Sequence, residues 1–247
     1  MIYLYSTDGN GADAIIDVLG HKELVRFPVV RYMDFDKHVT SIVSQVTPKD
    51  IVIVDTIDML AATWRGDHNL GTDPTETMWG KKERFFKEKP GYGLYTGPEG
   101  MIIRQLKNLS RGGEGAKIIT TVHEAVRIDE TTVPPTKKRS PDLNPALLGS
   151  LMGSSSHVFR MARINEPIFN DQNEEVVAVG SRILQLRVTE EYTAKAPYEE
   201  KLPKALTNPT LPRLWKLLGF VPTWLTVYGP PGVGKSTFVT SSLREKV

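Results

Sequence analysis

Residues 229–237 have the types and the spacing needed to hold the phosphates of a nucleotide. They match the pattern G-x-x-x-x-G-K-[ST] at every fixed position. Glycines let the backbone turn tightly and bring N–H groups close to phosphate oxygens. Lys235 is placed to reach the β- and γ-phosphates of ATP, and the Ser236 hydroxyl is placed to ligate Mg²⁺. The residues predicted to contact the nucleotide are Gly229, Pro230, Pro231, Gly232, Val233, Gly234, Lys235, Ser236 and Thr237.

The segments on either side of this loop predict an α/β setting. Residues 224–228 are apolar and rich in strand-forming types, and residues 235–246 continue as a helix whose N-terminal end faces the anion. Only residues 238–247 follow the loop, so the rest of the sheet must come from earlier in the chain. This position predicts a circular permutation of the usual order. In the alternative, residues 229–247 begin a truncated second domain, and residues 1–222 have no phosphate loop.

A carboxylate that could support Mg²⁺ follows an earlier strand. Residues 50–55 read Asp-Ile-Val-Ile-Val-Asp, which is typical of a buried parallel strand that ends at Asp55. Ligands of open α/β sheets bind at that end of the strands. We therefore expect Asp55 to hold Mg²⁺ through water, in the Walker B role. The alternative is a helix N-cap, because Asp55 to Asp58 could equally start a helix.

When residue 247 is joined to residue 1, the predicted strands and helices alternate. This predicts one doubly wound, mostly parallel α/β domain over residues 1–247. Residues 198–222 form a connector with a short amphipathic helix, and they lead into the C-terminal loop unit, residues 223–247. In circular order the predicted elements are strand 224–228, helix 235–246, strand 2–6, helix 11–19, strand 26–31, helix 36–46, strand 50–55, helix 99–110, strand 117–122, strand 156–164 and strand 180–189.

Read in this order, the chain resembles the RecA-like recombinase ATPases, and among them the phage single-strand-annealing type. The resemblance covers nearly the whole chain. It implies a circularly permuted RecA-like P-loop fold that binds and hydrolyses ATP. The matching segments are the loop at 229–237, the Walker B strand at 52–58, a glycine–tyrosine segment at 91–97 and a strand end at 121–124.

The resemblance also implies roles for three single residues. Asp8 falls where the family has a Glu that activates water; it is one methylene shorter, and the alternative for its Asp-Gly-Asn-Gly setting is a turn. His123 falls at the sensor position, where a polar side chain contacts the γ-phosphate; the alternative is a surface His at a strand end. Lys195 matches the Lys of a Thr-Lys-x-Arg motif that reaches a neighbouring subunit's nucleotide, although Pro197 stands in place of the Arg.

Two segments are predicted to face single-stranded DNA. In the RecA-like plan they follow the Walker B and sensor strands, here residues 64–97 and 124–145. The first interleaves cations with aromatic rings, which suits stacking on bases and neutralising phosphates. The second carries a basic cluster in a Pro/Ser/Thr-rich setting, which predicts a mobile loop; the alternative for both is a solvated basic surface. The candidate DNA-binding residues are Arg65, Lys81, Lys82, Arg84, Arg127, Lys137, Lys138 and Arg139.

The composition bounds the partners and the compartment. A net charge of +2 over 247 residues gives no global field, so any nucleic-acid site must be local. The absence of cysteine excludes disulfides and thiolate metal sites. The sequence has no signal-peptide pattern and no apolar run near the ~20 residues of a membrane helix. We therefore expect a cytoplasmic protein with no membrane partner, located in the bacterial host cell if it is phage-encoded.

Three functions are consistent with these features. The first is a DNA-dependent ATPase that uses ATP and Mg²⁺, binds single-stranded DNA and assists recombination or annealing. It would self-associate into a ring or filament and work beside a single-strand-binding protein. The second is a P-loop nucleotide or small-molecule kinase, with residues 137–139 as its lid. The third is a non-catalytic, ATP-switched assembly or loader protein, favoured if Asp8 cannot activate water.

Overall fold

Among the residues that the computed structural model describes, the strands form one nine-stranded sheet and a separate two-stranded hairpin. The structure describes residues 1–7, 24–27, 32–61, 63, 98–111, 115–129, 134–143, 145–169 and 175–241. The strands are β1 (Ile2–Ser6), β2 (Leu24–Phe27), β3 (Ile51–Asp55), β4 (Lys117–Asp129), β5 (Thr136–Pro141), β6 (His157–Arg163), β7 (Ile168–Phe169), β8 (Glu175–Val177), β9 (Arg182–Gln185), β10 (Ala205–Thr207) and β11 (Trp224–Gly229). The helices are α2 (Tyr32–Ile42), α6 (Pro98–Arg111), α7 (Pro145–Ser154), α8 (Leu211–Leu218) and α9 (Lys235–Val239), with a 3-10 turn at Glu199–Lys201.

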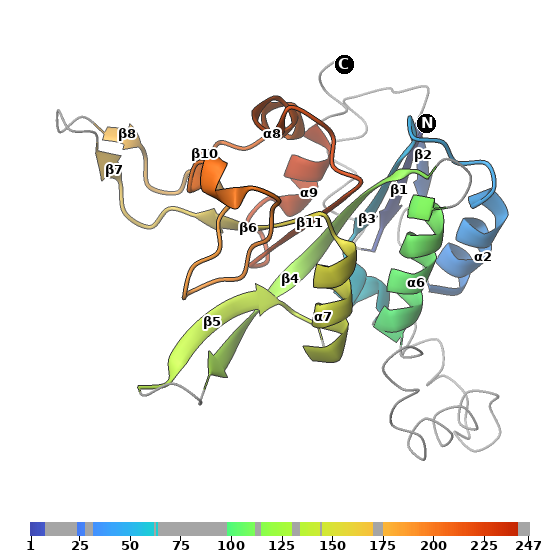
Figure 1. Cartoon of the computed structure of the whole chain (residues 1–247), viewed down its shortest axis with the longest axis horizontal. Coiled ribbons are helices and arrows are strands. Elements are labelled where there is room, and N and C mark those ends of the chain that lie inside the picture. Colours follow the sequence, from blue (N-terminus) through green and yellow to red (C-terminus); the bar gives the residue numbers. More distant parts are fainter. Residues whose placement is uncertain are drawn as a thin grey trace.

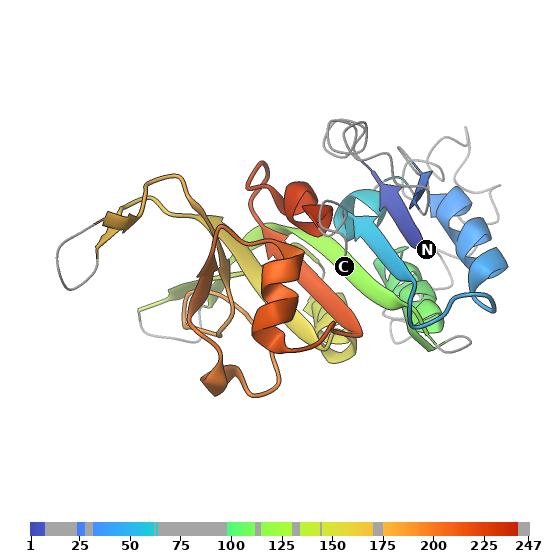
Figure 2. The ribbon, with the colours of Figure 1, turned by 90° about the horizontal axis from the view of Figure 1, so that it is seen from above.

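The large sheet has the order β10-β9-β6-β11-β4-β3-β1-β2, and β5 pairs with the far part of β4 (Figure 1). The six strands from β6 to β2 are parallel. β9 pairs antiparallel with β6, and β10 pairs antiparallel with β9. The late strand β11 thus lies in the middle, between β4 and β6 (Figure 2). The alternative of a separate second domain that begins at residue 229 is therefore wrong.

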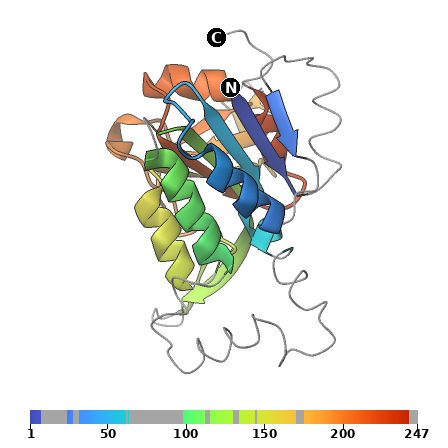
Figure 3. The same cartoon turned by 90° about the vertical axis from the view of Figure 1, so that its right-hand side faces the viewer.

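Helices cover both faces of this sheet. On one face α2, α6 and α7 pack over strand residues such as Ile118 and Trp224 (Figure 3). On the other face α8 and α9 pack over Ile119 and Leu225, which are the next residues along the same two strands. Successive strand residues point to opposite faces, so a strand that is apolar at every position can fill two cores. The prediction of an α/β fold with a mostly parallel sheet is confirmed in this coarse form, with helices on both faces.

The prediction of a mobile loop over residues 124–145 is wrong for the residues that the structure describes there. β4 continues past the sheet to Asp129 and returns through the antiparallel β5, with Val126 opposite Arg139 and Ile128 opposite Lys137. The physical reason lies in Ala-Val-Arg-Ile-Asp at 125–129, whose apolar and charged residues alternate with a strand period. In Figure 1 this hairpin projects beyond the body of the sheet.

Other boundaries move by a few residues. Helix α2 spans 32–42 rather than 36–46, and β2 spans 24–27 rather than 26–31. The predicted connector helix is α8, which begins after the cap Thr210 and ends at Gly219 in the left-handed conformation. The predicted helix 11–19 and the segment 64–97 lie outside the described residues.

Candidate nucleotide-binding site

The phosphate loop joins β11 to α9, and its glycines have specific geometric reasons. Gly232 and Gly234 have φ angles of 70° and 98°, in the left-handed region that side chains rarely adopt. A Cβ on Gly229 would lie 2.2 Å from the carbonyl oxygen of Met161 on β6. Glycine therefore permits both the turns of the loop and the close approach of β11 to its neighbour.

Lys235 folds back into the loop that precedes it. Its ammonium donates to the carbonyl oxygens of Gly229 at 3.0 Å and Pro230 at 3.1 Å, and the residue is only 5% exposed. A buried cation needs such acceptors, because burial without them is costly. Phosphate oxygens are stronger acceptors of this kind than neutral carbonyls. The lysine is therefore held where it can exchange carbonyl contacts for an anion.

Asp55 lies at the same edge of the sheet as the loop. Val54 pairs with Thr120 on β4, and on the other side of β4 Thr121 pairs with Val227. The buried carboxylate of Asp55 accepts a hydrogen bond from the Thr121 hydroxyl. The turn of helix that follows is capped differently, since the Thr56 hydroxyl accepts from the N–H of Met59 at 3.4 Å. Asp55 is thus a strand-end carboxylate rather than the helix cap.

The backbone around Asp55 is tied to the strand on its other side. The carbonyl oxygen of Asp55 accepts from the N–H of Thr7 at 2.8 Å and from the Thr7 hydroxyl at 3.0 Å. That hydroxyl in turn accepts from the N–H of Thr56 at 2.9 Å, and the peptide bond between Asp55 and Thr56 is cis. These contacts fix the carboxylate between β1 and β4. Asp8, which follows Thr7, lies outside the described residues.

His123 is next to the first residue of the loop and is held by Asp58. It pairs with Gly229 across β4 and β11. Its Nδ1 lies 2.5 Å from Asp58 Oδ2, and its backbone N–H donates to Oδ1 at 3.1 Å. Burial alone raises the pKa of Asp58, but the hydrogen bonds and charge of His123 outweigh this, so its net pKa is lowered. An ionised Asp58 then orients the imidazole, which is about one quarter exposed.

Three arginines on the opposite side of the loop were missed from the sequence. Arg160 of β6 holds Glu124 through two bonds of 2.5 and 3.1 Å, and Arg163 donates to the carbonyl oxygen of Gly232 at 3.0 Å. Arg182 of β9 packs its guanidinium against Gly234. The basic residues of strands 156–164 and 180–189 were visible, but nothing local indicated that β6 adjoins β11 or that β9 runs back toward the loop.

Lys195 was predicted to reach a neighbouring subunit, but its ammonium is hydrogen-bonded within its own chain. Its ammonium donates to the carbonyl oxygens of Met152 at 2.5 Å and Ser155 at 2.7 Å. These carbonyls belong to the C-terminal end of α7, where a cation is favourable. Lys195 therefore has a structural role within its own chain.

The candidate DNA-binding residues divide into three groups. Arg127 donates to the Ser140 hydroxyl at 2.8 Å and to the carbonyl oxygen of Leu143, so its guanidinium is used within the hairpin. Lys137 is exposed, Lys138 is half-buried, and Arg139 lies 3.5 Å from Glu124. The candidates outside the described residues are Arg65, Lys81, Lys82 and Arg84.

Comparisons with models of protein families, with curated proteins and with solved structures give no match to this chain. No helix within the described residues is long and apolar enough to cross a membrane. In the same part of the chain, no three acidic or His side chains gather as a metal site. Mg²⁺ held by one or two carboxylates and by substrate phosphates does not need such a cluster.

Proposed function

We propose that this chain is a RecA-like ATPase that binds ATP and Mg²⁺ at residues 229–237. One observation carries the proposal. β4 lies between β11 and β3, so the loop, His123 and Asp55 meet at a single edge of the sheet. These residues are far apart in the chain, and the carboxyl ends of parallel strands are where α/β sheets bind ligands. The central place of β11 also supports a permuted fold, because the strand before the loop lies between β4 and β6, which both precede it in the sequence.

Each residue has a distinct task in this proposal. Lys235 exchanges its carbonyl contacts for the β- and γ-phosphates, and Ser236 offers its hydroxyl to the metal. Asp55, kept in place by the Thr121 hydroxyl, would accept a hydrogen bond from water bound to the metal. His123, oriented by Asp58, donates to the γ-phosphate. Bound Mg²⁺ would neutralise charge on the phosphates, and Asp8 stays the predicted water-activating residue.

We further propose single-stranded DNA as the partner of the β4–β5 hairpin. β4 runs without a break from the interior strand beside the loop, through His123, into this projecting hairpin. The hairpin exposes Lys137 together with the apolar side chains of Val126 and Ile128, which are 57% and 59% exposed. A cation neutralises phosphates of a single strand, and exposed apolar side chains beside it can contact the faces of unpaired bases. Self-association into a ring or filament and a single-strand-binding partner stay predictions.

ATP turnover, measured with and without single-stranded DNA, tests the proposal. We expect wild-type turnover to rise with DNA, and Lys235→Ala to lower it by about 100-fold or more. Lys216→Gln, an equal change of charge on the exposed surface of α8, should behave as wild type. Tight ATP binding without turnover would favour the switch alternative, and transfer of phosphate to a nucleotide would favour a kinase. Absence of ATP binding would reject all three.

The DNA part has its own measurement. Binding of a single strand releases counterions, and the slope of log K against log salt is about −0.7 for each phosphate contact. The double variant Lys137→Gln/Lys138→Gln should reduce that slope by about 1.4. The control is Lys204→Gln/Lys216→Gln, which removes two exposed charges elsewhere. An unchanged slope in the hairpin variant would place the DNA on another surface.

A further inference from the structure

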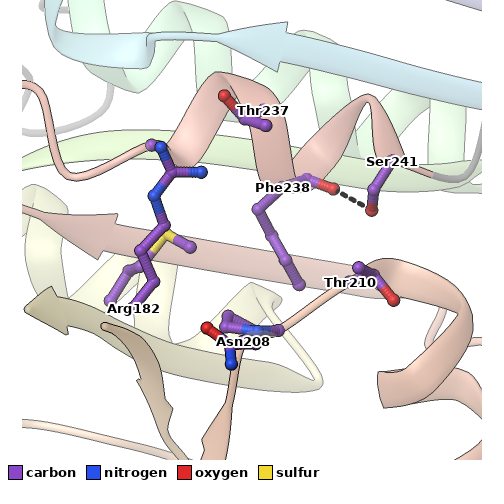
Figure 4. Close-up of a pocket in the computed structure, with 9 residues that line it drawn as sticks. Arg182, Asn208, Thr210, Thr237, Phe238 and Ser241 are labelled. Atoms are coloured by element: carbon purple, nitrogen blue, oxygen red, sulfur yellow. Dashed lines mark hydrogen bonds between the residues drawn. The ribbon is translucent and has the colours of Figure 1, made fainter. Parts of the chain in front are cut away.

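A pocket of about 390 Å³ lies beside the phosphate loop, where Gly234 of the loop and Met161 of β6 contribute to its lining (Figure 4). One wall is Thr237 and Phe238 of α9, together with Ser241 just after this helix. The opposite wall comes from the segment between β10 and α8, with Asn208 and Thr210. Its volume falls in the ~300–1,000 Å³ range of small-molecule sites. The mixture of one aromatic ring with several polar groups suits a ligand that is part ring and part hydroxyl.

Arg182 stands at the point where this pocket meets the loop. A Cβ built on Gly234 would lie 2.7 Å from the guanidinium carbon, so the cation packs directly on the loop backbone. Arg160, Arg163, Arg187 and Arg213 all donate hydrogen bonds to protein acceptors. Within the described residues the Arg182 guanidinium donates to none. A partly buried cation with this placement is suited to an anion at the loop.

The wall opposite α9 is held in place at several points. Asn208 donates its backbone N–H to the carbonyl oxygen of Arg182 at 2.8 Å, and its own carbonyl accepts from Arg213 at 2.8 Å. The Ser241 hydroxyl accepts from the N–H of Leu211 at 2.8 Å and donates to the carbonyl oxygen of Phe238. These bonds connect the two walls to each other. The pocket is therefore pre-formed, which limits the entropy lost when a ligand binds.

The proposed function would give the bound nucleotide a direction. In it, Lys235, Ser236 and Asp55 hold the γ-phosphate end on the side of β4. A triphosphate that crosses the loop from there would reach the side of β6, where Thr237 and Arg182 line the pocket.

We propose that this pocket takes the nucleoside of the bound triphosphate, and that Arg182 contacts its inner phosphates. The inference rests on the proposed function and assigns the part of the ligand that the loop pattern does not describe. The ring of Phe238 forms the apolar floor, and the side chain of Asn208 supplies a hydrogen-bonding edge to the base or the ribose. Gly234 is then required twice, for its φ angle and because any side chain there would displace Arg182.

Titration calorimetry with two ligands tests this assignment. ATP has the nucleoside, whereas inorganic tripolyphosphate has only the phosphates. We expect wild type to bind ATP at least about tenfold more tightly than tripolyphosphate. Arg182→Gln should weaken both ligands by about tenfold. Asn208→Gly should weaken ATP alone; glycine tolerates the left-handed φ of 43° at this position, so the wall keeps its shape.

The controls separate this inference from the proposed function. Lys216→Gln removes one positive charge from an exposed site and should bind both ligands as wild type does. Equal affinity of wild type for ATP and tripolyphosphate would overturn the nucleoside pocket and leave the phosphate site intact. Wild-type affinity of Arg182→Gln for both ligands would overturn the role of Arg182. If wild type binds neither ligand, the proposed function fails together with the inference.

Discussion

The two sides of β11 differ in the sign of the charge that they present to the phosphate loop. Toward β4 and β3 the ionisable groups are carboxylates with neutral or weakly basic donors, Asp55 with Thr121 and Asp58 with His123. Toward β6 and β9 they are arginines, of which Arg160 is paired with Glu124 and Arg182 lies against the loop backbone. Carboxylates suit a metal ion and its water, and arginines suit phosphate oxygens. A triphosphate that carries a metal ion near one end should therefore bind in one orientation, with the metal toward Asp55 and the other phosphates toward the arginines.

The two sides also differ in how strongly they are built into the fold. Arg160 and Glu124 form a buried ion pair with side chains 11% and 8% exposed, and Gln185 accepts a further bond from Arg160 at 2.7 Å. The Asp58–His123 pair is more open, at 16% and 26%. A buried charge that loses its partner is far more costly than a solvated one. Substitutions on the arginine side should therefore lower the free energy of unfolding more. Substitutions on the carboxylate side should lower ATP turnover more, because these residues are the ones proposed to support the metal.

The largest expected effect is on Arg160. Arg160→Met leaves Glu124 buried without its main partner, so we expect the free energy of unfolding to fall by about 3–5 kcal/mol. Urea unfolding followed by circular dichroism measures it. The double variant Arg160→Met/Glu124→Met should recover much of the loss, because the uncompensated charge is gone. A loss below about 1 kcal/mol in the single variant would contradict the comparison.

The next effect is on Asp55. Asp55→Asn keeps the shape of the side chain but removes its charge, so ATP turnover should fall by about 100-fold, or about 2.7 kcal/mol of activation free energy. ATP affinity should change much less, because the loop supplies most of the phosphate contacts. Asp50→Asn, the same change just before β3 begins, is the control and should keep turnover within about twofold. Equal turnover in the two variants would remove Asp55 from the site.

The smallest effect concerns Asp58 and depends on pH. Its pKa in the folded protein is lowered from the ordinary 3.8, because the contacts with His123 outweigh the effect of burial. Its stabilisation is therefore fully present above that ordinary value and is lost as pH falls through the lowered one. Asp58→Asn should be about 1 kcal/mol less stable than wild type at neutral pH. The difference should shrink below about pH 4, and a constant difference down to pH 2 would contradict this pairing.

The part of the site that the sequence revealed consists of residues with a local signature. The glycines and Lys235 are fixed by one loop, and Asp55 by the strand that precedes it, so each could be identified without knowing its neighbours. The alternation of helices and strands also predicted the two-faced sheet. Arg182 and Glu124 had no such signature, because their positions depend on which strands pair, and pairing joins residues distant in the chain. The β4–β5 hairpin was missed since proline and serine at its ends outweighed the alternation within it.

The central position of β11 has a consequence for the order of synthesis. Its neighbours β4 and β6 emerge earlier, and the Thr120–Thr226 hydrogen bond joins residues 106 positions apart. Until residues 224–229 leave the ribosome, each neighbour has an unpaired strand edge, which can pair with another chain. Contacts of such long separation also slow folding. We expect the newly synthesised chain to stay in two unjoined parts and to need protection from aggregation until β11 has been made.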